Sequence, residues 1–218
     1  MRETARTGDV VSSVRIKICG IVHPDDAQAA VDAGVDMIGL NFVPGTPRCL
    51  DVKRAEAIVE RVGPQVEKVA VFRDATWDEI ERVIRRIEVE RVQLHGSEEP
   101  EDVEQVDLPV IKALRGADRE AAERYPGTIL LLDHPTEGGG RGRTWNWAEA
   151  GPLIDEGFDV ILAGGLDPTN VGQVLAELGD LLPWGVDVAT GVEGEAHRKD
   201  PAKVRAFLEA VRKAEAGS

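Results

Sequence analysis

The regular alternation of short apolar segments with helical ones restricts the fold of this chain more than any other feature. Eight segments are rich in Val, Ile and Leu and have the length of buried strands: Arg15–Cys19, Asp36–Phe42, Lys68–Phe72, Arg91–Leu94, Val110–Ala113, Thr128–Asp133, Asp159–Ala163 and Gly185–Val188. Helical patterns lie between them, most clearly at Pro24–Ala33, Val52–Arg61, Trp77–Ile87, Pro168–Leu178 and Pro201–Ala214. Two of these helices open with proline after aspartate, in Asp167-Pro168 and Asp200-Pro201, which is typical of helix starts. The alternation predicts a parallel sheet, either a barrel or a doubly wound sheet.

An internal repeat favours the barrel. The segment Val31–Leu40 resembles Ile154–Ala163, and each contains a helix end, a glycine suited to the C-terminal cap and a buried strand. One αβ unit repeated far apart in the chain suits a ring of equivalent modules. No linker or low-complexity segment divides the chain. We therefore predict an α/β fold, a single-domain (β/α)8 TIM barrel over residues 15–214, after a polar N-terminal extension over residues 1–14.

Composition argues against several classes of partner and location. The net charge is −14, with 26 basic and 40 acidic residues, so nucleic acid is not expected as a partner. No apolar run approaches the roughly 18 residues that a membrane span needs. The N-terminus lacks the apolar stretch of a secretory signal, so we expect a cytoplasmic protein without membrane contact. Two cysteines without metal-ligand spacing predict neither a disulfide framework nor a metal site.

The basic residues are mostly arginine, because lysine occurs at only seven positions. Many acids with few lysines suit a cytoplasm of high ionic strength, where a Debye length of roughly 3 Å at about 1 M salt screens repulsion among carboxylates. The pattern predicts a halophilic protein, and an ordinary acidic protein is the alternative.

In a (β/α)8 barrel the active site lies at the C-terminal ends of the strands, which directs attention to two residues. Cys19 ends the first predicted strand, where it is either a catalytic thiol or a small buried side chain. Asp133 ends an apolar run, and partial desolvation there favours the protonated carboxyl that a general acid needs. The alternative for Asp133 is a cap on the following turn.

Two further candidates lie near the ends of the second and fourth strands. Arg48 closes a loop that Pro44 and Pro47 stiffen, and a guanidinium held in this way is suited to bind a substrate carboxylate. Most loop arginines are instead solvated or paired with acids. His95 is a candidate for polar contact at the barrel mouth, but the sequence offers it no nearby carboxylate partner.

Glycines after the seventh and eighth strands give a stronger signal. Gly164-Gly165 and Ala189-Thr190-Gly191 let backbone N–H groups approach an anion, and a short helix after the eighth strand would add its positive N-terminal end. These two loops form the common phosphate site of the barrel. Tight turns that need glycine are the alternative for either loop alone. The Gly-rich and Arg-rich segment 137–144 is either a loop that closes over the site or a surface connection.

Taken in order, these motifs resemble the phosphoribosylanthranilate isomerase family from about Arg15 to Val211. The most specific matches are Lys17-Ile18-Cys19-Gly20, Thr46-Pro47-Arg48, Val92-Gln93-Leu94-His95-Gly96, Leu131-Leu132-Asp133, Gly164-Gly165-Leu166 and Gly185-Val186-Asp187-Val188. The resemblance implies that Cys19 is the general base, Asp133 the general acid and Arg48 the ligand of the anthranilate carboxylate. It further implies substrate contacts from Gln93, His95 and Asp187 and phosphate contacts from Gly164, Gly165, Ala189, Thr190 and Gly191. The family usually has two serines in place of Ala189-Thr190, so one side-chain hydroxyl is lost here.

The implied reaction is an Amadori rearrangement in tryptophan biosynthesis, an aldose–ketose isomerisation that needs no cofactor and no metal. Its partner is a phosphorylated small molecule, and the chain is expected to be a monomer or a homodimer. The reaction needs a neutral carboxyl and an ionised thiol, and the charge of Lys17 would favour the thiolate. Another phosphate-binding barrel, such as indole-glycerol-phosphate synthase or the histidine-pathway sugar isomerase, is disfavoured by Cys19. A non-catalytic phosphate-sugar-binding barrel is disfavoured by the presence of Cys19, Arg48 and Asp133.

Overall fold

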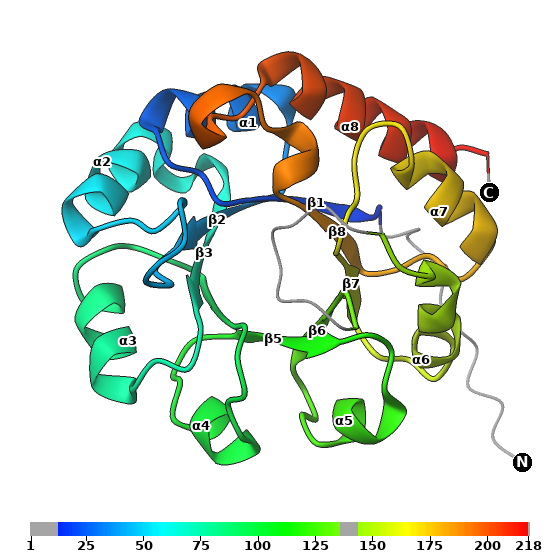
Figure 1. Cartoon of the computed structure of the whole chain (residues 1–218), viewed down its shortest axis with the longest axis horizontal. Coiled ribbons are helices and arrows are strands. Elements are labelled where there is room, and N and C mark those ends of the chain that lie inside the picture. The colour runs from blue at the N-terminus through cyan, green and yellow to red at the C-terminus, as the bar shows by residue number, and fades with distance from the viewer. Residues whose placement is uncertain (1–12, 136–143, 218) are drawn as a thin grey trace, which may run out of the picture.

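A closed ring of parallel strands forms the centre of the molecule, and helices surround it (Figure 1). The computed structural model describes residues 13–135 and 144–217. The strands are β1 Arg15–Cys19, β2 Met37–Asn41, β3 Glu67–Phe72, β4 Arg91–Leu94, β5 Val110–Arg115, β6 Ile129–Asp133, β7 Val160–Leu162 and β8 Gly185–Val188. The α-helices are α1 Pro24–Ala33, α2 Val52–Val62, α3 Trp77–Ile84, α4 Pro100–Glu104, α5 Arg119–Glu123, α6 Gly151–Asp155, α7 Val171–Leu178 and α8 Pro201–Glu215. The predicted (β/α)8 TIM barrel is confirmed.

Strand pairing closes the ring and determines which side chains face its interior. Each strand pairs in parallel with the next, and β8 returns to β1 with Lys17 opposite Asp187. Because side chains alternate along a strand, one set faces the helices and the other faces the barrel interior. The interior set forms its own apolar cluster: Met37, Val69, Ile111, Ala113, Ile129, Leu131, Ile161 and Ala163. Above this cluster the interior positions become polar, which places reactive side chains at the C-terminal mouth.

Helix caps bear out most of the local predictions. Gly34 and Gly157 follow α1 and α6 with φ of 92° and 91°, the left-handed conformation that glycine adopts without strain. Both halves of the internal repeat therefore turn from helix to strand in the same way. Pro201 opens α8 after the cap Asp200, whose side chain accepts the N–H groups of Ala202 and Lys203.

Several predicted boundaries were wrong for local reasons. The helix predicted from Pro168 begins at Val171, because the Asp167 carboxylate accepts the N–H groups of Thr169 and Asn170 and holds this stretch as a turn. The helix predicted to reach Ile87 ends at Ile84. Helices α4 and α5 were not predicted, and of α6 only the C-terminal end was, since five residues are too few for a helical period.

The short helix expected after the eighth strand is present as two 3-10 turns, η3 Thr190–Val192 and η4 Glu195–His197. Two other 3-10 turns, η1 Gly63–Gln65 and η2 Trp147–Ala150, precede β3 and α6. Of the predicted N-terminal extension, residues 1–12 lie outside the described residues, and so do residues 137–143 of the predicted loop 137–144.

Candidate active site

One cavity at the C-terminal mouth of the barrel brings together all the predicted site residues. Its lining includes Cys19, Arg48, Gln93, His95, Asp133, Gly164, Gly165, Asp187, Ala189, Thr190 and Gly191. These residues come from six different strand ends, so the closed ring is what assembles them. The walls also contain apolar side chains, notably Val43, Val71 and Leu166, beside which an aromatic ring could pack.

Cys19 lies beside an ion pair whose lysine is fully buried. Lys17 projects into the barrel two residues before Cys19, is 0% exposed and donates to Asp187 Oδ1 at 2.8 Å. Gly39 on β2 leaves room for this arrangement, because an added Cβ would lie 2.7 Å from Cys19 Sγ and 3.2 Å from Lys17 Nζ. Sγ and Nζ therefore share one small space at the end of β1.

Electrostatics at Cys19 run against one expectation. Burial raises the pKa of the Cys19 thiol, and the nearby ammonium of Lys17 offsets only part of this effect. Burial alone would lower the pKa of Lys17, but attraction to Asp187 and to Cys19 raises it above its usual value. Lys17 thus favours the thiolate, as expected, yet the net effect of the surroundings is to favour the thiol.

Arg48 is paired with an acid, the alternative that the sequence had left open. The side chain is buried, and Nε and Nη2 donate to the two carboxylate oxygens of Glu193 at 2.6 and 2.9 Å. Nη2 also lies 3.0 Å from Thr190 Oγ1, and Lys199 Nζ donates to Glu193 Oε1 at 2.9 Å. Burial would raise the pKa of Glu193, but Arg48 and Lys199 lower it to about 2, so the carboxylate is ionised. One carboxylate between two cations leaves the cluster positive.

Glu193 and Lys199 were not among the site residues predicted from the sequence. Both lie after β8, where a single Glu and a single Lys among many charged residues carry no distinctive spacing. The partner of Glu193 is Arg48, 145 positions earlier in the chain. Only the closure of the barrel, which sets β8 beside β1 and close to β2, makes this contact visible.

Asp133 and His95 contact each other across β5, since His95 follows β4 and Asp133 ends β6. His95 Nε2 lies 3.2 Å from Asp133 Oδ2, and the backbone N–H of His134 donates to Asp133 Oδ1 at 2.8 Å. Ala113 on the intervening strand has only a methyl group and does not fill this space. The carboxylate partner that the sequence did not reveal for His95 is therefore Asp133 itself.

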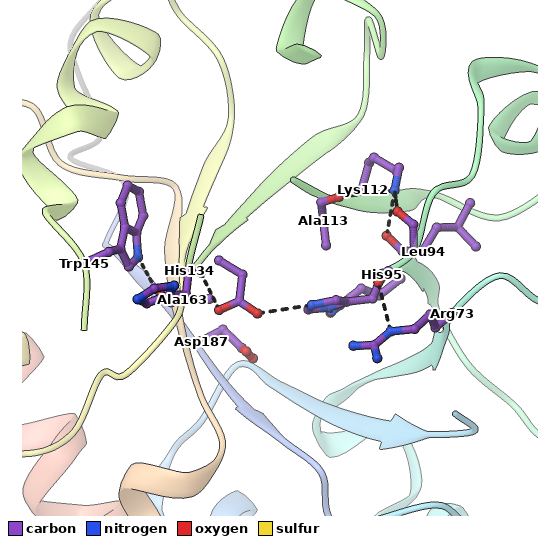
Figure 2. Close-up of polar contacts among 12 residues, drawn as sticks. Arg73, Leu94, His95, Lys112, Ala113, His134, Trp145, Ala163 and Asp187 are labelled. Carbon is purple, nitrogen blue, oxygen red and sulfur yellow. Dashed lines mark hydrogen bonds and ion pairs between the residues drawn. The ribbon is translucent and has the colours of Figure 1, made fainter. Parts of the chain in front are cut away.

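Neighbouring strands fix the position of His95. Lys112 from β5 is buried and donates to the carbonyls of Leu94 and Gly96, on either side of His95, at 3.4 and 2.8 Å. Gln93 Nε2 lies 2.8 Å from His95 Nδ1 on the inner side of the ring. Figure 2 shows the His95 ring extending toward β6, with Arg73 and Lys112 on the other side of it.

Glycine positions bring the two predicted phosphate loops into contact with each other and with Asp133. An added Cβ at Gly191 would lie 2.2 Å from the Leu166 carbonyl oxygen, so only glycine allows the β8 loop to pack on the β7 loop. An added Cβ at Gly164 would lie 2.7 Å from Asp133 Oδ1 and 2.8 Å from His134 N. Gly164 and Gly165 have φ of 79° and 80°, which exposes backbone at the cavity wall.

The described residues contain neither a candidate metal site nor a helix that could span a membrane. No group of three or more His, Cys, Asp or Glu side chains in residues 13–135 and 144–217 is arranged to hold a metal ion. Over the same part of the chain, no helix has the length and apolar character needed to cross a membrane.

Known proteins that resemble this chain in sequence and in structure are phosphoribosylanthranilate isomerases. The family described as "PRAI: N-(5'phosphoribosyl)anthranilate (PRA) isomerase" matches residues 16–210. An N-(5'-phosphoribosyl)anthranilate isomerase from Pseudomonas putida is 42% identical over 211 residues, which are 94% of this chain and 100% of that protein. The crystal structure of phosphoribosyl anthranilate isomerase from Thermus thermophilus has a TM-score of 0.83 at 39% identity, covering 92% of this chain and 99% of that one.

A further solved structure contains a ligand. It is a phosphoribosyl anthranilate isomerase in complex with reduced 1-(o-carboxyphenylamino)-1-deoxyribulose 5-phosphate, with a TM-score of 0.80 at 30% identity, covering 92% of this chain and 99% of that one. The match extends over almost all of both chains, and it includes every strand that contributes to the cavity. This chain therefore belongs to the N-(5'-phosphoribosyl)anthranilate isomerase family.

Proposed function

We propose that this chain isomerises N-(5-phosphoribosyl)anthranilate to 1-(2-carboxyphenylamino)-1-deoxyribulose 5-phosphate, an Amadori rearrangement in tryptophan biosynthesis. The observation that carries the proposal is that Cys19 and Asp133 line one cavity from β1 and β6, with Arg48 and two glycine-containing loops at the same mouth. An acid, a base, a cation and an anion cradle are the parts that this reaction needs. Family membership supports the same reaction.

Asp133 is the group that we assign as general acid. Protonation of the ribose ring oxygen weakens its bond to C1′, and the anilinic nitrogen supplies the electron pair that forms the iminium as the ring opens. Asp133 is buried at 6% exposure but lines the cavity, so its carboxyl can reach a bound sugar without much competition from water. Its contact with Gly164 sets it beside the loop assigned to the phosphate.

Cys19 is the group that we assign as general base. A thiolate removes the proton from C2′ of the iminium, which gives an enolamine that tautomerises to the ketose product. Burial raises the pKa of the thiol, so ionisation must be assisted by the Lys17 ammonium and by the positive iminium itself. An iminium close to Sγ adds a cation where the charge of the thiolate develops, so the base is activated when the acid step has occurred.

Arg48 is the group that we assign to the anthranilate carboxylate. Glu193 accepts from Nε and Nη2, and no contact of Nη1 is recorded within the described residues, so Nη1 remains to bind a ligand. The Arg48–Glu193–Lys199 cluster keeps an excess positive charge, which an incoming carboxylate would balance. Glu193 therefore orients the guanidinium rather than replacing the substrate as its partner.

The phosphate is assigned to the glycine loops after β7 and β8. Gly164, Gly165 and the backbone of Ala189, Thr190 and Gly191 line the same side of the cavity, and η3 begins at Thr190. Backbone N–H groups at this turn would donate to phosphate oxygens without a serine hydroxyl. The Thr190 hydroxyl contacts Arg48, so it links the phosphate loop to the carboxylate site.

Turnover of phosphoribosylanthranilate, followed as loss of substrate fluorescence, tests the proposal. Cys19→Ala and Asp133→Asn should each lower kcat by about 10²–10⁴-fold, the usual contribution of a general acid or base. Cys49→Ala is the matched control, because Cys49 lies outside the cavity lining and should not affect turnover. A folded wild-type protein that binds the substrate without converting it would instead indicate a non-catalytic barrel.

A further inference from the structure

The Gln93 side chain has an unusual surrounding. It is 1% exposed, and its Nε2 lies 2.8 Å from His95 Nδ1. Among the described residues, Gln93 Oε1 is the buried side-chain oxygen or nitrogen that has no hydrogen-bond partner. An unpaired buried polar atom costs about 1–3 kcal/mol. The observed orientation of the Gln93 amide carries this cost, so the opposite orientation of the same amide is energetically accessible.

The observed contacts require one tautomer of His95. An amide NH₂ group can only donate, so His95 Nδ1 must accept from Gln93 and the ring proton must be on Nε2. Nε2–H then donates to Asp133 Oδ2, while Oδ1 accepts from the His134 backbone. Both oxygens of Asp133 accept in this arrangement, which suits the ionised carboxylate and not the acid.

Rotation of the Gln93 amide by half a turn reverses the direction of two hydrogen bonds, the one between Gln93 and His95 and the one between His95 and Asp133. Oε1 then accepts from a proton on Nδ1, and Nε2 of His95 becomes able to exchange a proton with Asp133 Oδ2 at 3.2 Å. Either orientation leaves one amide atom unpaired, so neither is strongly preferred on that account. The rotated orientation is the one that is compatible with a protonated Asp133.

We infer that the Gln93 amide rotates when the His95–Asp133 pair takes up a proton, and that in the rotated orientation His95 Nε2 and Asp133 Oδ2 share that proton. The inference rests on the proposed function and adds two positioning residues to it, since Gln93 and His95 act on the substrate through Asp133. Imidazole is a stronger base than a carboxylate, so the His95 ring can hold the proton that Asp133 then delivers to the substrate. This explains how a carboxyl can act as an acid near neutral pH.

The proton balance closes over one turnover. Nε2–H of the imidazolium passes its proton to Asp133 Oδ2, and Asp133 passes a proton to the ring oxygen as the C1′–O bond breaks. His95 is left neutral with its proton on Nδ1, bonded to Gln93 Oε1. The proton that leaves the 2′ hydroxyl when the enolamine becomes a ketone restores the pair, and the proton on Cys19 goes to C1′. No oxidant, reductant or further reactant is needed.

Charged groups around His95 do not supply a competing partner for the shared proton. Arg73 from the end of β3 donates to the His95 carbonyl at 3.4 Å, and Lys112 from β5 is paired with Glu98 at 2.8 Å. Asp187 from β8 lines the same cavity and is paired with the buried ammonium of β1. Asp133 is the carboxylate that directly contacts the ring.

Nuclear magnetic resonance tests the shared proton without any turnover. In ¹⁵N- and ¹³C-labelled enzyme, the ring nitrogens of His95 and the carboxyl carbon of Asp133 should titrate with one common midpoint. Gln93→Glu presents an acceptor only, so the His95 proton should stay on Nδ1 while that carboxylate is ionised. His23→Asn identifies one of the other histidine signals, because His23 caps α1 away from the cavity.

Kinetics supply the second readout. His95→Asn should lower kcat at neutral pH by about 10–100-fold, part of the usual general-acid contribution, with KM changed less than about threefold. The remaining activity should be largest at a lower pH than in the wild type. Gln93→Met, which can neither donate nor accept strongly, should lose more turnover than Gln93→Glu, and His23→Asn should lose none.

Separate midpoints for His95 and Asp133, with the ring proton fixed on Nε2 throughout, would overturn the inference. Wild-type kcat in His95→Asn would overturn it as well, even if Asp133→Asn is inactive and the proposed function stands. Conversely, a wild-type chain without isomerase turnover would remove the proposed function, while the resonance titration would still decide whether the proton is shared.

Discussion

The two sides of the barrel mouth hold their reactive groups by different means. Around β1, β2 and β8, buried ion pairs fix the side chains: Lys17–Asp187, Arg48–Glu193 and Lys199–Glu193. Around β4 and β6, Gln93, His95 and Asp133 are linked by hydrogen bonds, with one amide oxygen unpaired. The side with the proposed base and carboxylate site therefore holds fixed charges, whereas the side with the proposed acid is held by hydrogen bonds alone, which suits the proposed movement of a proton.

The largest stability difference should appear when each side loses one polar group. Glu193→Gln leaves two buried cations without their carboxylate and should lower the free energy of unfolding by about 3–5 kcal/mol. Gln93→Met removes a side chain that is only half satisfied and should cost no more than about 1 kcal/mol. Chemical denaturation of both variants measures the contrast, and equal losses would show that the two sides do not differ in this way.

Acid should weaken the ion-paired side in particular. The pKa of Glu193 is lowered from 4.5 to about 2, so this carboxylate contributes stability above its unfolded pKa and loses it as the pH falls toward the folded value. At about 1.4 kcal/mol for each pH unit, the contribution is about 3 kcal/mol and disappears between roughly pH 4.5 and 2. The stability difference between wild type and Glu193→Gln should therefore shrink over this window, and a constant difference would contradict the assignment.

Replacement of Arg48 by Lys sharpens the account of the carboxylate site. Lysine keeps the charge but has no planar fork, so it cannot bind Glu193 through two nitrogens and a ligand through a third. Affinity for a carboxylated substrate analogue should fall by about 1.5–3 kcal/mol, while the same analogue without its carboxylate should lose little. If both ligands lose affinity equally, Arg48 acts by shaping its loop.

The salt response should be the smallest of these effects. Exposed acids repel one another in dilute buffer, and salt reduces the Debye length from about 10 Å at 0.1 M to about 3 Å at 1 M. Thermal stability should rise with KCl by a few degrees, roughly 2–4 °C for each kcal/mol gained. The rise should be smaller in a triple variant that replaces the exposed Glu60, Glu101 and Glu120 by Gln. Full stability and activity without added salt would argue for an ordinary acidic enzyme.

The sequence predicted the fold and most of the residues that line the cavity, for identifiable reasons. The bounds of β1 and α1 were predicted to the residue, because Gly20 follows the strand and Pro24 and Gly34 mark the two ends of the helix. Cys19 and Asp133 were found because they terminate strands. Helix α4 was missed because a helix of five residues completes little more than one turn.

The pairings within the site could not be predicted, because they join distant parts of the chain. Glu193 has no local signature, and its importance follows only from Arg48 being 145 residues away and yet in contact. His95 looked isolated because its carboxylate partner lies two strands further round the barrel. Burial was also underestimated at Cys19, where its effect on the thiol pKa exceeds that of Lys17.

The contact of Gly164 with Asp133 limits how this barrel could evolve or be redesigned. Barrels of this kind gain new substrates by exchange of the loops at the strand ends, and each loop is often treated as an independent part. Here the loop after β7 has no side chain at Gly164 because Asp133 Oδ1 and His134 N would occupy the place of a Cβ. A new loop grafted at this position would therefore displace Asp133, unless it kept a glycine there or the residue that ends β6 changed with it.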